Sequence, residues 1–263
     1  MSNQSALATA EAALPVDLVE IRPGRSIAVH IRCRGLSGSP NQPPPENPPP
    51  RLFFVHGSCA SMLQYRALID HLSGAGHEVI AYDFLGCGRS SKPLSWSAYD
   101  FAELRSDLIA VIDRYSGGAG DDSTRTKNVL VCHSAGCSLG IGVAARGAGA
   151  AYVDGMVLMG GPAGPYRAHP VFYLPVPILD RLQPTLSAGF ESLALHPRTF
   201  EGSTEERKEA LALAKDTNGS NPMSMCKAYY RQMVLPPRRR AARGRAGGQY
   251  LPHSRRLRQT RPS

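Results

Sequence analysis

Residues 128–136 read NVLVCHSAG, a sequence that predicts a strand, a sharp turn and a helix in immediate succession. Asn128–Val131 is expected to form the strand, and the small residues after Ser134 indicate the helix. A serine in such a turn has a strained backbone, and its hydroxyl is lifted clear of the sheet; the arrangement is called a nucleophile elbow. Strand and helix lie so close there that only small side chains fit. Gly136 supplies one flank of the turn, and Cys132 is small enough for the other.

Short strands alternate with amphipathic helices on both sides of this turn. A hairpin comes first, with strands at Val16–Ile21 and Ser26–Ile31. The further strands are expected at Leu52–Val55, Glu78–Tyr82 and Gly155–Met159, and the helices at 61–75, 98–115 and from the serine to about Gly147. Such alternation is typical of α/β proteins, in which a mostly parallel sheet carries helices on both faces. Functional residues in such folds follow the carboxyl ends of the strands.

Composition divides the chain into successive segments. They are a small, polar, disordered start (1–15), an α/β core (16–162) with a proline-rich insertion (35–50), a helical lid or cap region (163–235) and an arginine-rich disordered tail (236–263). Within the lid region, Thr204 to about Lys215 predicts a helix, with two glutamates in its first turn.

The net charge of +9 originates in the tail at 236–263. That segment holds nine arginines and no lysine or acidic residue, so residues 1–235 carry no net charge. Three interpretations compete: a nucleic-acid arm, a membrane-surface patch, or an out-of-frame or intron-derived end that was never selected to fold. Because residues 1–235 show no basic stripe with interleaved aromatics, no specific nucleic-acid partner is expected, while contact with a membrane surface stays open.

Composition also bears on compartment and cofactors. No run approaches the roughly 18 apolar residues of a spanning helix, and the first residues lack a secretory signal. The cysteines are scattered, with no C-x-x-C motif, and are Cys33, Cys59, Cys87, Cys132, Cys137 and Cys226. We interpret them as free thiols of a reducing compartment, the cytoplasm. No metal-binding cluster, phosphate-binding loop or dinucleotide fingerprint is present in the sequence, so no cofactor is expected.

Three motifs follow three of the expected strands in order. They are His56-Gly57, the run Asp83-Phe84-Leu85-Gly86-Cys87-Gly88-Arg89-Ser90, and Cys132-His133-Ser134-Ala135-Gly136. With this series, the hairpin and the helical region, the chain from about Val16 to Val234 resembles the α/β-hydrolase-fold serine hydrolase superfamily. The runs Leu18–Arg25 and Leu52–Gly57 are similar to the branch of the animal abhydrolase domain-containing protein eight.

The resemblance implies roles for individual residues. Ser134 would attack an acyl carbonyl, and the backbone N–H groups of Ala135 and Ser58 would form the oxyanion hole. A tight structural turn near the pocket is implied for Asp83, Gly86, Gly88 and Ser90, and structural positions for His56, Gly57, His133 and Gly136. A serine rather than an aspartate at position 134 argues against epoxide hydrolase or haloalkane dehalogenase chemistry, in which a carboxylate attacks.

An acid and a histidine are implied as well, in that order after the serine, and neither is found where the pattern requires it. The resemblance stops at about Val234-Leu235, and the histidine beyond that point is His253, inside the arginine-rich tail. The fold is therefore expected to be truncated after the lid region. Gly155–Met159 would then be an unprotected apolar edge, and the chain poorly soluble.

Two functions stay open. The lineage indicates a hydrolase of small-molecule acyl esters, or an acyltransferase, that works through a Ser134 acyl-enzyme. The apolar residues of the lid region favour a lipid-like acyl group, and loss of the acid and histidine would impair the activity. The alternative is a catalytically inactive domain that serves as a binding or scaffold protein.

Overall fold

The structure, a computed structural model, describes residues 14–32, 48–116, 126–145, 153–161, 167–194 and 220–233, together with residues 205, 208, 209, 211–213 and 215. The strands are β1 Asp17–Arg22, β2 Arg25–Arg32, β3 Arg51–Val55, β4 Val79–Tyr82, β5 Asn128–His133 and β6 Gly155–Met159. The helices are α2 Arg66–Gly74, α3 Phe101–Tyr115, α4 Ala135–Ala144, α6 Val176–Ala194 and α8 Met223–Gln232. Short 3₁₀ helices are η1 Met62–Tyr65, η2 Trp96–Tyr99 and η3 Pro170–Tyr173.

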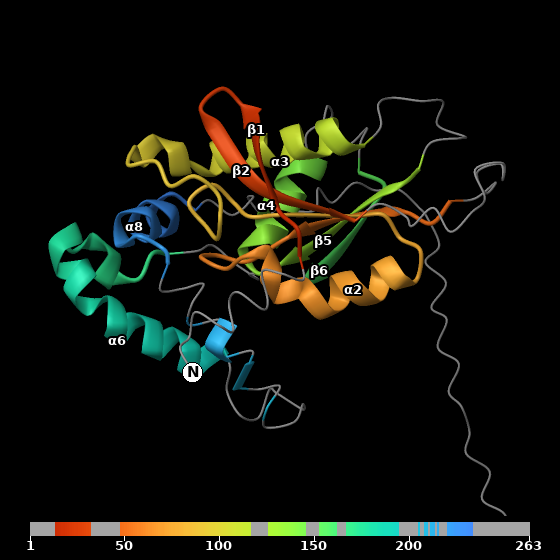
Figure 1. Cartoon of the computed structure of the whole chain (residues 1–263). Helices are drawn as coiled ribbons and strands as arrows, with labels where there is room; N and C mark the ends of the chain where they lie inside the picture. The colour runs from red at the N-terminus through yellow and green to blue at the C-terminus, as the bar shows by residue number, and fades with distance from the viewer. Residues whose placement is uncertain are drawn as a thin grey trace, which may run out of the picture.

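The six strands form one sheet in the order β1-β2-β4-β3-β5-β6 (Figure 1). The β1–β2 hairpin is antiparallel, and β2 pairs with β4 antiparallel, while β4, β3, β5 and β6 run parallel to one another. The predicted hairpin and the mostly parallel sheet are thus confirmed. Val55 is in register with both Tyr82 and Cys132, so the carboxyl ends of β3, β4 and β5 lie side by side. The three motifs that follow these strands are therefore neighbours.

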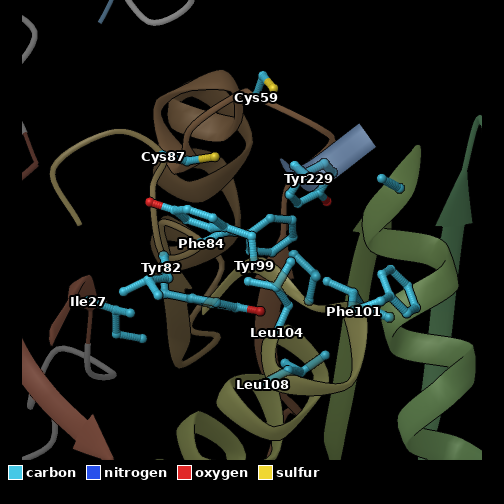
Figure 2. Packing of buried hydrophobic residues seen from close by; sticks show 14 of the residues in the cluster. Ile27, Cys59, Tyr82, Phe84, Cys87, Tyr99, Phe101, Leu104, Leu108 and Tyr229 are labelled. Atoms are coloured by element: carbon cyan, nitrogen blue, oxygen red, sulfur yellow. The ribbon is translucent and has the colours of Figure 1, made fainter. Parts of the chain in front are cut away.

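Each face of the sheet has its own apolar core, as the alternation of buried residues along β3 illustrates. Phe53 and Val55 belong to the core under α3 and α4, and Leu52 and Phe54 belong to the core under α2. Figure 1 shows these helices on opposite faces of the sheet. The predicted apolar face of α3 is buried as expected, and Figure 2 shows part of it packed with residues of β2, β4 and α8.

The lid region is more helical than the sequence suggested. The sequence predicted a helical lid region but located only one helix in it; the structure adds α6, which runs for 19 residues with Pro184 inside it, and α8. The helix predicted from Thr204 to Lys215 falls only in part on described residues, and those are helical. The tail at 236–263 and most of the insertion at 35–50 lie outside the described residues. No helix that the structure describes is long and apolar enough to cross a membrane.

Strand β6 lies at the edge of the described sheet and pairs with β5. The exposed fractions of Met156, Val157 and Leu158 are 39%, 47% and 46%. Three consecutive apolar side chains are thus exposed on a strand with one described neighbour, and the truncation that would leave this edge unprotected stays a prediction. Such an edge is a template for pairing with another chain.

Val157→Lys is therefore expected to lower the tendency of the purified chain to aggregate, because a charge on an edge strand opposes edge-to-edge pairing. Light scattering at increasing protein concentration measures the effect. Leu94→Lys makes the same change of charge at a residue that is 91% exposed and outside the sheet. An equal gain in both variants would show that net charge, and not the β6 edge, limits solubility.

Candidate active site

Ser134 occupies the turn between β5 and α4 with φ 50° and ψ −118°, in the left-handed region that a serine rarely adopts. Its N–H donates to the carbonyl of Met159 at 2.9 Å, and its own carbonyl accepts from the N–H of Cys137 at 3.0 Å. These two hydrogen bonds hold the strained backbone in place. The side chain is partly exposed, while Cys132 and Ala135 beside it are buried.

The helix α4 approaches β3 so closely that the flanks of the turn admit only small residues. A Cβ atom at Gly136 would lie 2.4 Å from the carbonyl oxygen of Val55 and 2.6 Å from that of His56. On the other flank, a Cβ at Gly140 would lie 2.7 Å from the sulfur of Cys132. The thiol of Cys132 thus packs against the bare backbone of Gly140, which explains how a residue larger than glycine is accommodated.

The loop after β3 lies directly against the elbow. A Cβ atom at Gly57 would be 3.1 Å from Nδ1 of His133 and 3.2 Å from Cβ of Ser134. Ser58 follows, partly exposed, and Cys59 after it has φ 54°. The structure therefore brings Ser58, Ser134 and Ala135 to one end of the sheet, where Ala135 begins α4 and its N–H belongs to the positive end of the helix.

His56 is fully buried, and both ring nitrogens have partners. Its Nδ1–H donates to the carbonyl of Gly57 at 2.7 Å, and its Nε2 accepts from the N–H of Phe84 at 2.9 Å. The ring stacks on Phe84 with centroids 3.9 Å apart. Burial lowers the pKa of His56 to about 4. This neutral ring joins the loops after β3 and β4, an arrangement that favours a structural role.

Asp83 organises the turn after β4. Its buried carboxylate accepts from the N–H of Met62 at 2.7 Å and from the N–H of Arg89 at 3.0 Å. Gly88, with φ 48°, passes so close to this carboxylate that any Cβ would overlap it. Burial raises the pKa of Asp83 to about 6, against the opposing effect of these hydrogen bonds. Ser90 completes the turn by donating to the carbonyl of Asp83 at 2.7 Å.

Asp83→Asn is expected to make the free energy of unfolding rise with pH between about pH 4 and pH 6.5. The folded pKa of Asp83, about 6, lies above its ordinary 3.8, so its contribution to stability is lost as pH rises towards 6. The folded pKa of His56, about 4, lies below its ordinary 6.5, so its contribution is lost as pH falls towards 4. Each of these two contributions to the free energy of unfolding is worth about 3 kcal/mol. In the wild-type chain they change in opposite directions with pH, so their effects on the slope largely cancel.

Urea unfolding across this pH range measures the slope, which is the readout because the substitution also changes the absolute stability. Asp180→Asn, at an exposed position of α6, controls for the change in net charge. Parallel pH profiles for Asp83→Asn and the wild-type chain would contradict the prediction.

No histidine among the described residues is hydrogen-bonded to a carboxylate. His133 is half-buried, its Nδ1 lies 3.5 Å from Nε2 of Gln64, and burial lowers its pKa. His169 accepts from the N–H of Val171 at the start of η3. His196 and His253 lie outside the described residues, as does the region in which the acid and histidine of a triad were sought. No group of three or more potential metal ligands is present in the described residues.

Helix α8 is the part of the site that the sequence did not reveal. Asn221, just before it, donates from Nδ2 to the carbonyl of Cys59 at 2.6 Å. Met225 fills the space beside Gly86, and burial raises the pKa of Tyr230 in the same helix. The spacing of Met225 and Tyr229, four residues apart on the buried face, was the available signal for the helix.

Comparison with known proteins agrees with this geometry. The model of the alpha/beta hydrolase family matches residues 52–261. The match extends past Val234 into residues that the structure does not describe, and the truncation inferred from the sequence stays a prediction. Protein ABHD8 of Bos taurus is 33% identical over 145 residues, which are 53% of this chain and 31% of that protein. Epoxide hydrolase B of Mycobacterium tuberculosis is 37% identical over 86 residues, 32% of this chain and 24% of that protein.

Solved structures with the same fold include epoxide hydrolase VrEH1 from Vigna radiata, at 19% identity and a TM-score of 0.59, with 85% of this chain and 73% of that one covered. A putative aryl esterase from Burkholderia cenocepacia gives 24% identity and a TM-score of 0.57, with 84% and 72% covered. Among the curated relatives, the part of ABHD8 that this chain matches is about a third of the length of that protein. By the family match, the sheet order and the strained serine elbow, this chain belongs to the alpha/beta hydrolase family.

Proposed function

We propose that this chain is a serine hydrolase of acyl esters in which Ser134 forms an acyl-enzyme. The observation that carries the proposal is the backbone of Ser134, a non-glycine residue with φ 50° at the carboxyl end of β5. Strain of this kind costs about 1–3 kcal/mol and persists where the surrounding structure enforces it, commonly at catalytic positions. Here Gly136 and the hydrogen bond to Met159 enforce it.

The choice of an ester rather than an epoxide as the substrate depends on the chemical group that attacks. Relatives and structural neighbours of this chain include epoxide hydrolases. A carboxylate can open an epoxide and be regenerated by hydrolysis of the resulting ester, whereas an alkyl ether formed on a serine would not hydrolyse. The hydroxyl of Ser134 is suited to an acyl carbonyl, because the acyl-serine that results is itself an ester that water can cleave.

In the proposed mechanism, Oγ of Ser134 adds to the carbonyl carbon and the oxygen becomes negatively charged. The N–H groups of Ala135 and Ser58 would stabilise that charge, which is worth about 10²–10³ in rate for each donor. Collapse releases the alcohol, and water then cleaves the acyl-serine. A base must take the proton from Ser134, and no described histidine has the carboxylate partner typical of that base. The second candidate is an inactive domain that binds a ligand or partner, and it is supported by the sequence, which has no acid and histidine at the positions that the pattern requires.

The finer features belong to the same proposal. A lipid-like acyl group and contact with a membrane surface are supported by exposed apolar side chains near the lid helices, among them Tyr173, Ile178 and Leu182. A cytoplasmic location is supported by the free thiols of Cys59, Cys87, Cys132, Cys137 and Cys226.

Covalent labelling with a fluorophosphonate probe tests the proposal. The full chain is treated in its folded state, and the modified peptide is identified by mass spectrometry. We expect one adduct per chain on the peptide that contains Ser134, and none after heat denaturation. A folded chain that stays unlabelled, or an adduct elsewhere, would overturn the proposal in favour of the binding domain. Hydrolysis of short and long acyl esters of one chromophore then tests the lipid-like preference.

A further inference from the structure

Two thiols from distant parts of the chain meet beside the proposed oxyanion loop. The sulfurs of Cys59 and Cys226 are 3.6 Å apart, although 167 residues separate them in sequence. Cys59 directly follows Ser58, and Cys226 lies in the first turn of α8. The S–H of Cys59 donates to the sulfur of Cys226, which makes Cys226 the acceptor of the pair.

The surroundings of Cys226 favour its thiolate. The hydrogen bond from Cys59 lowers the pKa of Cys226, and the first turn of a helix stabilises a negative charge. The exposed fractions are small but not zero, 7% for Cys59 and 8% for Cys226, so the pair lies nearer the surface than a fully buried thiol. Cys87, the third thiol of this region, is fully buried and burial raises its pKa. Figure 2 shows Cys59 and Cys87 at one end of the apolar cluster, with Tyr229 of α8 nearby.

We propose that Cys59 and Cys226 are an oxidation site, which a hydroperoxide converts reversibly into a disulfide that ties α8 to the loop of Ser58. The thiolate of Cys226 attacks the peroxide O–O bond, forms a sulfenic acid and releases an alcohol, or water from hydrogen peroxide. The sulfur of Cys59 then attacks that of Cys226, and the departing hydroxide leaves with the proton of Cys59 as water. In total, one peroxide and two thiols give one alcohol, one water and one disulfide.

The bond requires a movement of the loop. A disulfide has its sulfurs about 2.05 Å apart, so the two must approach by about 1.5 Å. Cys59 already has a left-handed backbone, and its carbonyl is held by Asn221. Because Ser58 adjoins Cys59 in this loop, we expect the approach to displace Ser58 as well. This consequence rests on the proposed function: if the N–H of Ser58 stabilises the oxyanion, formation of the disulfide lowers the rate of labelling at Ser134.

The experiment treats the purified full chain with hydrogen peroxide and counts its free thiols after denaturation, with peptide mapping of any cross-link. We expect two of the six thiols to disappear, a cross-linked peptide pair that contains Cys59 and Cys226, and full recovery with a dithiol reductant. Neither Cys59→Ser nor Cys226→Ser should form this cross-link, whereas Cys137→Ser should form it as readily as the wild-type chain. Cys59→Ala and Cys226→Ala replace the serine variants if those fail to fold.

The cross-link is read out by mass, independently of catalysis, so its failure is distinguishable from failure of the proposed function. Both thiols left free at a peroxide dose that oxidises exposed cysteines would overturn the proposal, as would a cross-link through Cys87 in place of either. A cross-linked chain whose Ser134 labelling rate is unchanged would retain the oxidation site and refute its effect on the oxyanion loop.

Discussion

Ser134→Ala is expected to abolish fluorophosphonate labelling and to reduce ester hydrolysis by about 10⁴-fold or more, because removal of a nucleophilic serine from comparable sites has effects of that size. The substitution removes the attacking oxygen and leaves the oxyanion donors and the packing of α4 intact. Alanine also keeps the strained backbone, so the free energy of unfolding should change little. Labelling with the probe and initial rates on a chromogenic ester measure the first effect, and urea unfolding the second.

A second variant at this position separates chemistry from strain. Ser134→Gly also lacks the nucleophile, but glycine tolerates φ 50° without a Cβ penalty. The free energy of unfolding of Ser134→Gly should exceed that of Ser134→Ala by about 1 kcal/mol or more. Ser106→Ala is the matched control and should label normally. The hydroxyl that it removes donates to the carbonyl of Ala102 within α3. Equal labelling of Ser134→Ala and Ser106→Ala would refute Ser134 as the nucleophile.

The sequence predicted the part of the fold that positions the serine, because in this part the local signals agree with the tertiary structure. The parallel strands are short and apolar. Three of them are followed by a motif in which a glycine is required by a close contact or a tight turn within the motif's own surroundings. Gly136 lies close to backbone oxygens, and Gly88 lies close to the Asp83 carboxylate. The strand β5 nonetheless extends to His133, because its pairing with β6 continues to Met159.

The lid region was predicted to be helical, but α6 and α8 were not located in it, for physical reasons. Pro184 lies inside α6, and a proline in a helix interior ordinarily breaks it. Helix α8 is ten residues long and partly polar, so its formation depends on packing against η2, η3 and α6 rather than on its own propensity. The pairing of Cys59 with Cys226 depends on that packing, and no spacing in the sequence indicates it.

Gly136→Ala is expected to destabilise the chain by about 3 kcal/mol, at the upper end of the usual cost of overpacking. Its Cβ would meet two backbone oxygens, those of Val55 and His56, at 2.4 and 2.6 Å. Backbone atoms at the end of a strand paired on both sides cannot rotate away as a flexible side chain can, so α4 itself must retreat from β3. Urea unfolding at neutral pH measures the loss.

Gly142→Ala, on the same helix, is the matched control. Its Cβ would lie 3.3 Å from Cδ of Arg105, a side chain that can move, and alanine favours a helix over glycine by about 1 kcal/mol. The control should therefore be neutral or slightly stabilising. The retreat of α4 in Gly136→Ala would also carry Ala135 away from Ser58, so its labelling at Ser134 should be slow even where the chain is folded. Equal stability of the two variants, or normal labelling of Gly136→Ala, would show that the close approach of α4 to β3 does not hold the elbow in place.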